Sequence, residues 1–236
     1  MRGQVSELED RLSAWVKDAL ASTWDRRNGQ KVPEPADLTL KNEAVDLDAV
    51  VLYADLADST DLVTSRSALF AAEVFKTYLF CAAQIIRSMG GVITAYDGDR
   101  IMAVFIGDSK NSNAAIAAYR IEWAVEKIIQ PAIQAQYPKN TYVLKQKVGI
   151  ASSPVTAVRT GVRNANDIVW VGNAANIAAK LAALKSGYST YITEAVFKML
   201  NDKAKKKNDG MSAIWTDLGG VQTFGRVYGT TYWRSP

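Results

Sequence analysis

The chain has 236 residues, of which 48% are hydrophobic and 22% charged, and this composition is typical of a soluble globular protein. Its net charge of +4 is small and scattered, so no nucleic-acid partner is predicted. The sequence contains no histidine, which excludes Ser-His-Asp triads, histidine general acid–base catalysis and His-ligated zinc. Any hydrolytic or transfer chemistry must therefore rest on carboxylates, lysine, arginine, hydroxyl groups and metal ions.

The cysteine content and the absence of targeting segments favour a reducing compartment. Cys81 is the single cysteine, so no internal disulfide can form. No apolar run approaches the roughly 20 residues of a membrane helix, and the N-terminus MRGQVSELED lacks the apolar region of a signal peptide. We expect a cytoplasmic protein without a membrane partner.

The N-terminal residues predict a helix followed by a linker. Residues 5–24 place apolar side chains on one stripe of an amphipathic helix, namely Leu8, Leu12, Trp15, Val16, Leu20 and Trp24. This stripe needs a partner, either the main domain or a second copy of the helix. The stretch RRNGQKVPEPAD (26–37) carries proline, glycine and charge, as linkers do. The predicted organisation is a helix at 1–25, a linker at 26–40 and the main domain at 41–236.

Strands and helices mix in the main domain without strict alternation. DAVVLYADL (48–56) is rich in valine and leucine, which indicates a strand buried on both faces. Further along the chain we expect a helix at 67–89, a hairpin at 91–105, a helix at 111–135, strands within 142–160 and at 167–172, a helix at 172–184, and strands near 213–217 and 226–233. The pattern predicts an α+β fold with a central, mostly antiparallel sheet flanked by helices.

Two aspartates lie at strand ends. Asp55 ends the first buried strand, and Asp99 follows the predicted hairpin turn in YDGDR. Sequentially adjacent strands tend to be neighbours in a sheet, and two adjacent carboxylates are stable when a cation lies between them. Oxygen ligands favour Mg²⁺ or Mn²⁺, and backbone N–H groups after Asp55 can receive phosphate oxygens. The alternative is that Asp58 caps a helix and Asp99 is a turn residue.

A second polar pair lies on the predicted helix 172–184. Asn176 and Lys180 are four residues apart and so share one helix face, while Ile177, Leu181 and Leu184 form the apolar stripe. On this evidence alone, the pair is either functional or part of a solvated face.

Three motifs, in order along the chain, resemble those of class III nucleotidyl cyclases. YADLADST (53–60) is similar to the family's F-x-D-I-x-G-F-T segment. GGVITAYDGDRIMAVF (90–105) resembles its G-G-x-x-x-K-x-x-G-D hairpin, and VGNAANIAAKL (171–181) resembles its G-x-x-V-N-x-A-A-R-L helix. Each motif is weak alone, whereas three in the right order are specific. The resemblance covers residues 45–233 and implies a cyclase-like fold with an additional N-terminal helix.

The resemblance also implies roles for individual residues. Asp55 and Asp99 match the family's two metal-binding aspartates, and the Leu56 carbonyl matches its backbone metal ligand. Asn176 matches the ribose-orienting asparagine, and Lys180 stands where the family has an arginine that stabilises the transition state. The segment after Leu56 is the expected triphosphate-binding segment, formed by Ala57, Asp58, Ser59 and Thr60. The family's sites form between two subunits, so a homodimer with two ions per site, Mn²⁺ or Mg²⁺, is expected.

The family's base-reading positions are changed in this chain. Adenylate cyclases read adenine with a lysine and an aspartate or threonine, where this chain has Ala95 and Val169. Neither residue has a polar side chain, so a purine would be left with unpaired hydrogen-bonding groups. The YDGDR turn resembles the pyrimidine cyclases of bacterial Pycsar antiphage systems, which make cyclic UMP or cyclic CMP for a separate effector protein. We expect UTP as substrate, with CTP as the alternative.

Four further residues are candidates for contacts with the substrate or the partner subunit. Tyr53, Tyr96 and Trp170 are candidates for the base pocket, with core packing as the alternative. Arg100 either supports the triphosphate or the subunit contact, or it forms an ion pair at the strand edge. No lysine occurs in DLGGVQTF (217–224), where one is expected for the γ-phosphate. An adenylate or guanylate cyclase, an inactive nucleotide-binding module and a purely structural dimer remain open alternatives.

Overall fold

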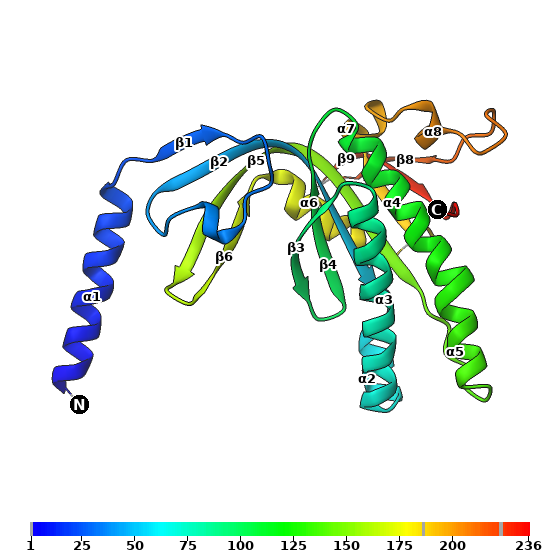
Figure 1. Ribbon diagram of the computed structural model, residues 1–236, viewed down its shortest axis with the longest axis horizontal. Helices are drawn as coiled ribbons and strands as arrows, with labels where there is room; N and C mark the ends of the chain where they lie inside the picture. Colours follow the sequence, from blue (N-terminus) through cyan, green and yellow to red (C-terminus); the bar gives the residue numbers. More distant parts are fainter. Residues whose placement is uncertain (1, 186, 222–223) are drawn as a thin grey trace. The chain divides into compact units, whose positions relative to one another are not determined.

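The structure, a computed structural model, describes residues 2–185, 187–221 and 224–236. The chain forms two compact units (Figure 1). The first unit comprises residues 1–47 and 156–171, and the second comprises residues 48–155 and 172–236. Two long strands contribute residues to both units, β2 (Glu43–Leu56) and β5 (Gln146–Val162).

A mixed sheet forms the centre of the second unit. Its strand order is β3-β4-β2-β5-β7-β9-β8, where β3 is Val92–Asp97, β4 is Arg100–Phe105, β7 is Thr190–Thr193, β8 is Thr216–Val221 and β9 is Gly225–Thr230. The pairs β3–β4, β2–β4, β7–β9 and β8–β9 are antiparallel, whereas β5 and β7 are parallel. The predicted α+β fold with a mostly antiparallel sheet is confirmed.

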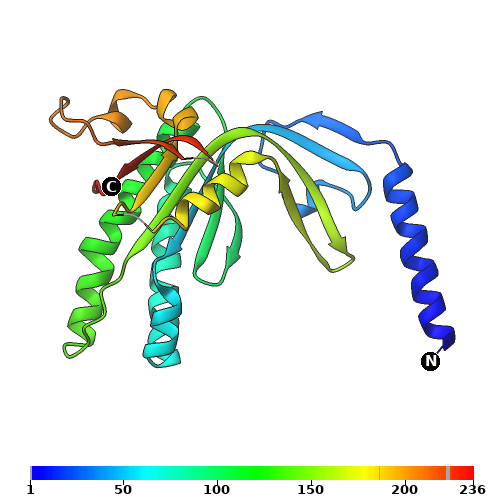
Figure 2. The ribbon, with the colours of Figure 1, turned by 180° about the vertical axis from the view of Figure 1, so that it is seen from behind.

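Helices flank this sheet, as Figure 2 shows from behind. They are α2 (Ser59–Ser65), α3 (Ala68–Ser88), α4 (Lys110–Ala124), α5 (Gln130–Gln136), α6 (Asn173–Ala182), α7 (Glu194–Lys198) and α8 (Asp202–Lys205). A π-helical turn, Val125–Ile129, joins α4 to α5, so the helix expected at 111–135 is two helices with a wider turn between them. The large buried side chains of this unit include Tyr78, Tyr119 and Phe105.

The sequence reasoning missed that one apolar helix is as long as a membrane span. Among the described residues, only α3 meets the criteria of length and composition, with 21 residues and a mean hydropathy of 1.4. Core helices of soluble proteins pass the same test. Six residues of α3 are buried against the sheet and neighbouring helices, among them Val74, Tyr78 and Ile86. The structure therefore uses α3 as a core helix.

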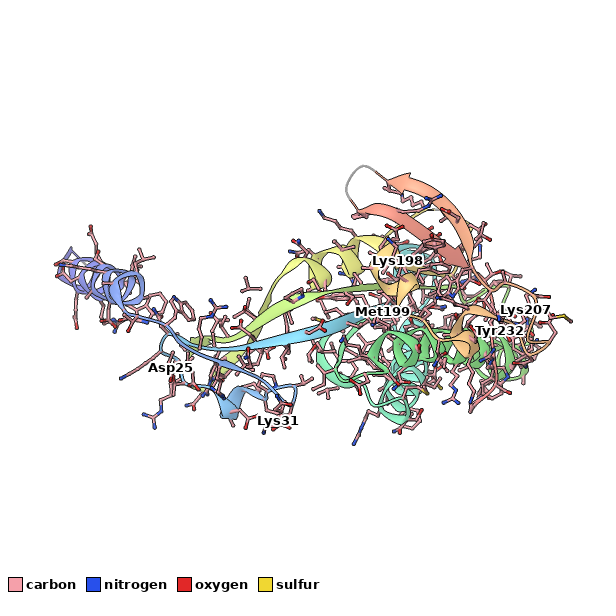
Figure 3. All side chains as sticks on the ribbon, turned by 90° about the horizontal axis from the view of Figure 1, so that it is seen from above. Asp25, Lys31, Lys198, Met199, Lys207 and Tyr232 are labelled. Carbon is pink, nitrogen blue, oxygen red and sulfur yellow. The ribbon has the colours of Figure 1, made fainter. Side chains whose placement is uncertain are left out.

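The first unit contains α1 (Arg2–Ala21), β1 (Asp25–Asn28), a 3-10 turn at Pro35–Asp37, the first part of β2, and β6 (Ala165–Val171). β1 pairs in parallel with β2 and β6 pairs antiparallel with β5. The segment expected to be a linker therefore contains most of a paired strand, which begins at Asp25 and ends before Lys31 (Figure 3). An ion pair of 2.9 Å between Arg26 and Asp46 joins β1 to β2.

Close packing at one glycine positions α6 in the second unit. A Cβ atom on Gly149 in β5 would lie 2.0 Å from the Ala178 carbonyl oxygen and 2.6 Å from the Ala182 nitrogen. Only glycine allows the helix backbone to approach the strand this closely. Gly149 therefore fixes where α6 presents its outer face.

Candidate active site

The β3–β4 hairpin turns one residue later than the sequence predicts. Asp97 belongs to β3 and pairs with Arg100, so Gly98 and Asp99 form the tip. Gly98 has a φ of +62°, which glycine adopts without strain. Asp99 is therefore a residue of the turn itself, and one of its carboxylate oxygens, Oδ2, is buried without a hydrogen-bond partner among the described residues.

Asp55, near the end of β2, lies beside this turn. Its Oδ2 atom accepts a hydrogen bond from Arg100 Nε at 3.2 Å and contacts Arg100 Nη2 at 3.1 Å. Its side chain is 15% exposed. Burial raises the pKa of Asp55, the negative charge of Asp99 raises it further, and the Arg100 guanidinium opposes both effects. The two carboxylates thus share one electrostatic environment with a single arginine.

The carboxylate pair fits a divalent cation. Burial and the charge of Asp99 disfavour the ionised form of Asp55, and Asp99 Oδ2 has no hydrogen-bond donor among the described residues. A bound cation would relieve both costs. Across the described residues, no group of three or more histidine, cysteine, aspartate or glutamate side chains could hold a metal. Two carboxylates are nevertheless sufficient for Mg²⁺, which keeps waters and takes substrate phosphates as its other ligands.

The segment after Asp55 offers fewer phosphate donors than the sequence suggests. The Ala57 N–H donates to the Lys145 carbonyl at 2.9 Å, so it is already occupied. Asp58 precedes α2 with a left-handed backbone (φ 59°, ψ 30°), but its side chain makes no capping hydrogen bond. The N–H groups of Ser59 and Thr60 lie in the first turn of α2, where no carbonyl of the same helix can pair with them.

A cavity of about 630 Å³ opens next to this segment in the second unit. Residues 55–58 form one wall, and α4, the start of β5 and the residues after α6 form the others. Three lysines line it, Lys145, Lys147 and Lys185. Sequence reasoning missed all three, because it looked for a cation at 217–224, of which residues 222 and 223 lie outside the described residues. The alternating Lys145 and Lys147 just before a buried strand were the available signal.

Acidic side chains also line the cavity, among them Glu122 and Glu126. Glu122 on α4 accepts a hydrogen bond of 2.5 Å from Gln146 Nε2 and another from Ser189, and burial raises its pKa. Lys147 Nζ donates to the Tyr188 carbonyl and lies 5.5 Å from the centre of the Tyr191 ring. Acidic and basic side chains therefore meet in one cavity that begins at Asp55.

Asn176 and Lys180 do not line this cavity. Both side chains are exposed on α6 and make no hydrogen bond or ion pair within residues 2–185, 187–221 and 224–236. The buried residues of α6 are Ala174, Ala175, Ala178, Leu181 and Ala182. Of the predicted apolar stripe, Leu181 is therefore buried, whereas Ile177 and Leu184 are only partly buried. Within one chain, nothing brings this pair into contact with the two aspartates.

The candidate base-contacting residues are divided between the two units. Tyr53 on β2 and Ala95 on β3 are partly buried in the second unit, and Tyr96 is 56% exposed. Val169 and Trp170 lie on β6 in the first unit. The indole Nε1 of Trp170 is buried and has no acceptor among the described residues. Burial raises the pKa of Tyr53, so its hydroxyl stays protonated and able to donate.

Comparison with known proteins identifies close relatives over the whole chain. A uridylate cyclase of Xanthomonas perforans is 48% identical over 229 residues, which cover 97% of this chain and 96% of the relative. A uridylate cyclase of Burkholderia cepacia is 47% identical and one of Rhodovulum is 35% identical, covering 90% and 97% of this chain and 94% and 98% of those relatives. No family model matches the chain.

Solved structures share the fold at lower identity. A bacterial light-regulated adenylyl cyclase superposes with a TM-score of 0.69 at 20% identity, covering 81% of this chain and 54% of that one. The adenylyl cyclase CyaB from P. aeruginosa superposes with a TM-score of 0.64 at 21% identity, covering 81% and 97%. At these identities the similarity shows the fold alone. It confirms the predicted class III cyclase-like architecture.

Proposed function

The chain belongs to the uridylate cyclase family, a group of nucleotidyl cyclases, and we propose that it converts UTP into 3′,5′-cyclic UMP and pyrophosphate. The observation that carries this proposal is the partly buried carboxylate pair Asp55 and Asp99, with Asp99 Oδ2 buried and unpaired among the described residues, and with Asp55 lining a cavity that three lysines also line. A nucleoside triphosphate with its divalent cations matches both features, because it brings positive ions to the carboxylates and anionic phosphates to the lysines.

The chemistry follows from the side chains present. Asp55, Asp99 and the Leu56 carbonyl would hold two ions, Mn²⁺ or Mg²⁺, which when bound neutralise the triphosphate and lower the pKa of the ribose 3′-hydroxyl. The 3′-hydroxyl gives up its proton, which passes through solvent to the pyrophosphate. The 3′-oxygen forms a bond to the α-phosphorus, the bond from that phosphorus to the bridging oxygen breaks, and pyrophosphate leaves. Lys145, Lys147 and Lys185 line the cavity and would bind the anionic leaving group. No step needs histidine.

The second half of the site comes from a partner subunit in this proposal. Asn176 and Lys180 are exposed and lie outside the cavity that begins at Asp55. In a two-fold dimer, α6 of one chain supplies this pair to the aspartates of the other, twice per dimer. Lys180 then meets the charge that develops on the α-phosphoryl oxygens, and Asn176 orients the ribose. Lysine is a point charge, so it stabilises this charge without the bidentate geometry of arginine.

Selection of a pyrimidine rests on the residues that replace the purine-reading pair. Ala95 and Val169 offer a purine no side-chain hydrogen bond. Uracil presents two carbonyl acceptors and an N3–H donor, whereas cytosine presents the acceptors O2 and N3 beside an amino donor, so a donor such as the Tyr53 hydroxyl suits either base. Three relatives that align over nearly the whole chain are uridylate cyclases. The absent purine contacts favour a pyrimidine, and the three relatives favour UTP over CTP.

Incubation of the purified protein with each nucleoside triphosphate and Mn²⁺ tests the proposal. We expect cyclic UMP from UTP, at least about tenfold less product from CTP, and none above background from ATP or GTP, with chromatography and mass spectrometry as the readout. Cyclic AMP as the main product would overturn the base assignment. Nucleotide binding without pyrophosphate release would favour an inactive binding module, and neither binding nor turnover would favour a structural dimer.

The product would act as a second messenger. By its likeness to pyrimidine cyclases of antiphage systems, the enzyme would make cyclic UMP in the cytoplasm during phage infection. A separate effector protein would detect the nucleotide. This part of the proposal is tested by infecting cells that carry the enzyme and measuring cyclic UMP in extracts, where a rise after infection is expected and an unchanged level would contradict it.

A further inference from the structure

The N-terminal helix α1 exposes the apolar stripe that the sequence predicted. Figures 1 and 2 show none of the other described elements of its unit alongside it. Trp15 is 65% exposed and Leu20 is 84% exposed. Leu8, Leu12 and Val16 are exposed as well, and so is Trp24, which lies beyond the last residue of α1. Most of the stability of a helix in a protein comes from packing of its apolar face, so we expect another surface to cover this stripe.

The helix is held in its unit at its C-terminal end. The Asn42 side-chain amide donates to the Ala19 carbonyl at 2.8 Å and to the Ser22 carbonyl at 2.9 Å. These bonds anchor the C-terminal end of α1, whereas residues 6–18 are exposed. The apolar stripe is thus presented on an anchored helix.

The spacing of the stripe matches helix pairing. Leu8, Leu12, Trp15 and Ala19 follow one another at intervals of four, three and four residues, which is the spacing of a coiled-coil seam. Such a seam packs against another helix of similar pattern, and a second copy of α1 has that pattern by definition. We propose that α1 pairs antiparallel with α1 of a second copy of the chain.

Two charged residues beside the seam favour an antiparallel orientation of the two α1 helices. Arg11 and Asp18 flank the same edge of the stripe, and neither has an ion-pair partner in the part of the chain that the structure describes. They are seven residues apart, about 10 Å along the helix, so they do not pair with each other. In an antiparallel pair, equal edges meet, and Arg11 lies opposite Asp18 of the partner subunit twice. In a parallel pair, Arg11 would face Val16 of the partner subunit.

A charge exchange tests this arrangement in the full-length protein. Arg11→Asp and Asp18→Arg should each raise the dimer dissociation constant about tenfold, measured by sedimentation velocity, because like charges then face each other twice. The double variant should return the constant to within about twofold of the unmodified chain. Failure of the double variant to restore dimerisation would overturn antiparallel pairing.

A second pair of variants tests the seam itself. Leu12→Glu should raise the dissociation constant by about tenfold or more, whereas Ala14→Glu, on the opposite side of α1, should leave it unchanged. Circular dichroism should show equal helix content for both variants. Equal dissociation constants for the two variants would overturn the proposal.

Binding to lipid is the alternative role of the stripe. If the protein sediments with anionic vesicles and Leu12→Glu abolishes this sedimentation, the stripe binds a lipid surface and the proposal is overturned. None of these measurements depends on which nucleotide the enzyme uses.

Discussion

Replacement of Asp99 by asparagine should abolish nucleotide cyclisation and yet stabilise the metal-free protein. Turnover should fall at least about 10³-fold, because the variant loses one of two carboxylates that would hold the ions. Stability should rise by about 1–2 kcal/mol, because the neutral amide no longer places a negative charge beside the Asp55 carboxylate. For a chain of this length the melting temperature should then rise by about 2–8 °C in the presence of a chelator.

The raised pKa of Asp55 determines how the stability gain of Asp99→Asn changes with pH. Burial and the charge of Asp99 raise the pKa of Asp55 above its ordinary value of 3.8, so the folded chain binds this proton more tightly than the unfolded chain. The stability that this proton confers is present below pH 3.8 and is lost as pH rises through the raised pKa. Without the Asp99 charge the loss should be smaller, so the advantage of Asp99→Asn should grow with pH.

An exposed carboxylate in the same hairpin serves as the control. Asp97→Asn should change neither the melting temperature by more than about 1 °C nor the turnover by more than about twofold. Thermal unfolding between pH 4 and pH 8, with and without Mn²⁺, measures the first quantity. A loss of stability in Asp99→Asn without metal would mean that Asp99 is a structural turn residue, which was the alternative interpretation of this position.

Mixed dimers of two inactive chains should regain activity. Asp99→Ala removes a residue from the aspartate half of the site, and Lys180→Ala removes one from the α6 half. A heterodimer of the two keeps one intact site and one doubly altered site. Heterodimers purified through two different tags should therefore show about half of the unmodified activity per dimer, and a random mixture about a quarter.

The matched control pairs two variants from the same half. Asp55→Ala combined with Asp99→Ala leaves every site with one aspartate missing, so no activity should return. Each single variant must remain below about 1% of the unmodified turnover for the comparison to hold. Equal inactivity of the Asp99→Ala and Lys180→Ala heterodimer would show that the site is not divided between subunits.

Local sequence patterns predicted the elements well where one physical signal dominates. The helix expected at 67–89 is α3, Ala68–Ser88, whose apolar positions recur with helical period. The hairpin expected at 91–105 is β3 and β4, although its tip is shifted from Asp97–Gly98 to Gly98–Asp99. A turn signal such as Asp-Gly does not by itself fix which two residues form the loop, because strand register decides this.

Contacts between segments that are distant in the chain could not be predicted from the sequence. Arg100 pairs with Asp55, which lies 45 residues earlier in the chain. The sequence left open whether Arg100 forms this ion pair or instead supports the triphosphate or the subunit contact. The Ala57 N–H is taken by Lys145, which no local pattern predicts. The short strand β1 has four exposed residues and no apolar alternation, so its pairing with β2 could not be seen beforehand. In each case tertiary pairing decided the outcome.

Anomalous diffraction from crystals grown with Mn²⁺ and a non-cyclising UTP analogue tests the central claim most directly. The claim is that Asp55 and Asp99 together bind divalent cations that engage a nucleotide triphosphate. We predict manganese peaks within about 2.3 Å of oxygens of both carboxylates, with the triphosphate on the same ions. Manganese bound to the triphosphate alone, with Asp55 still paired to Arg100 and Asp99 making no contact, would contradict it.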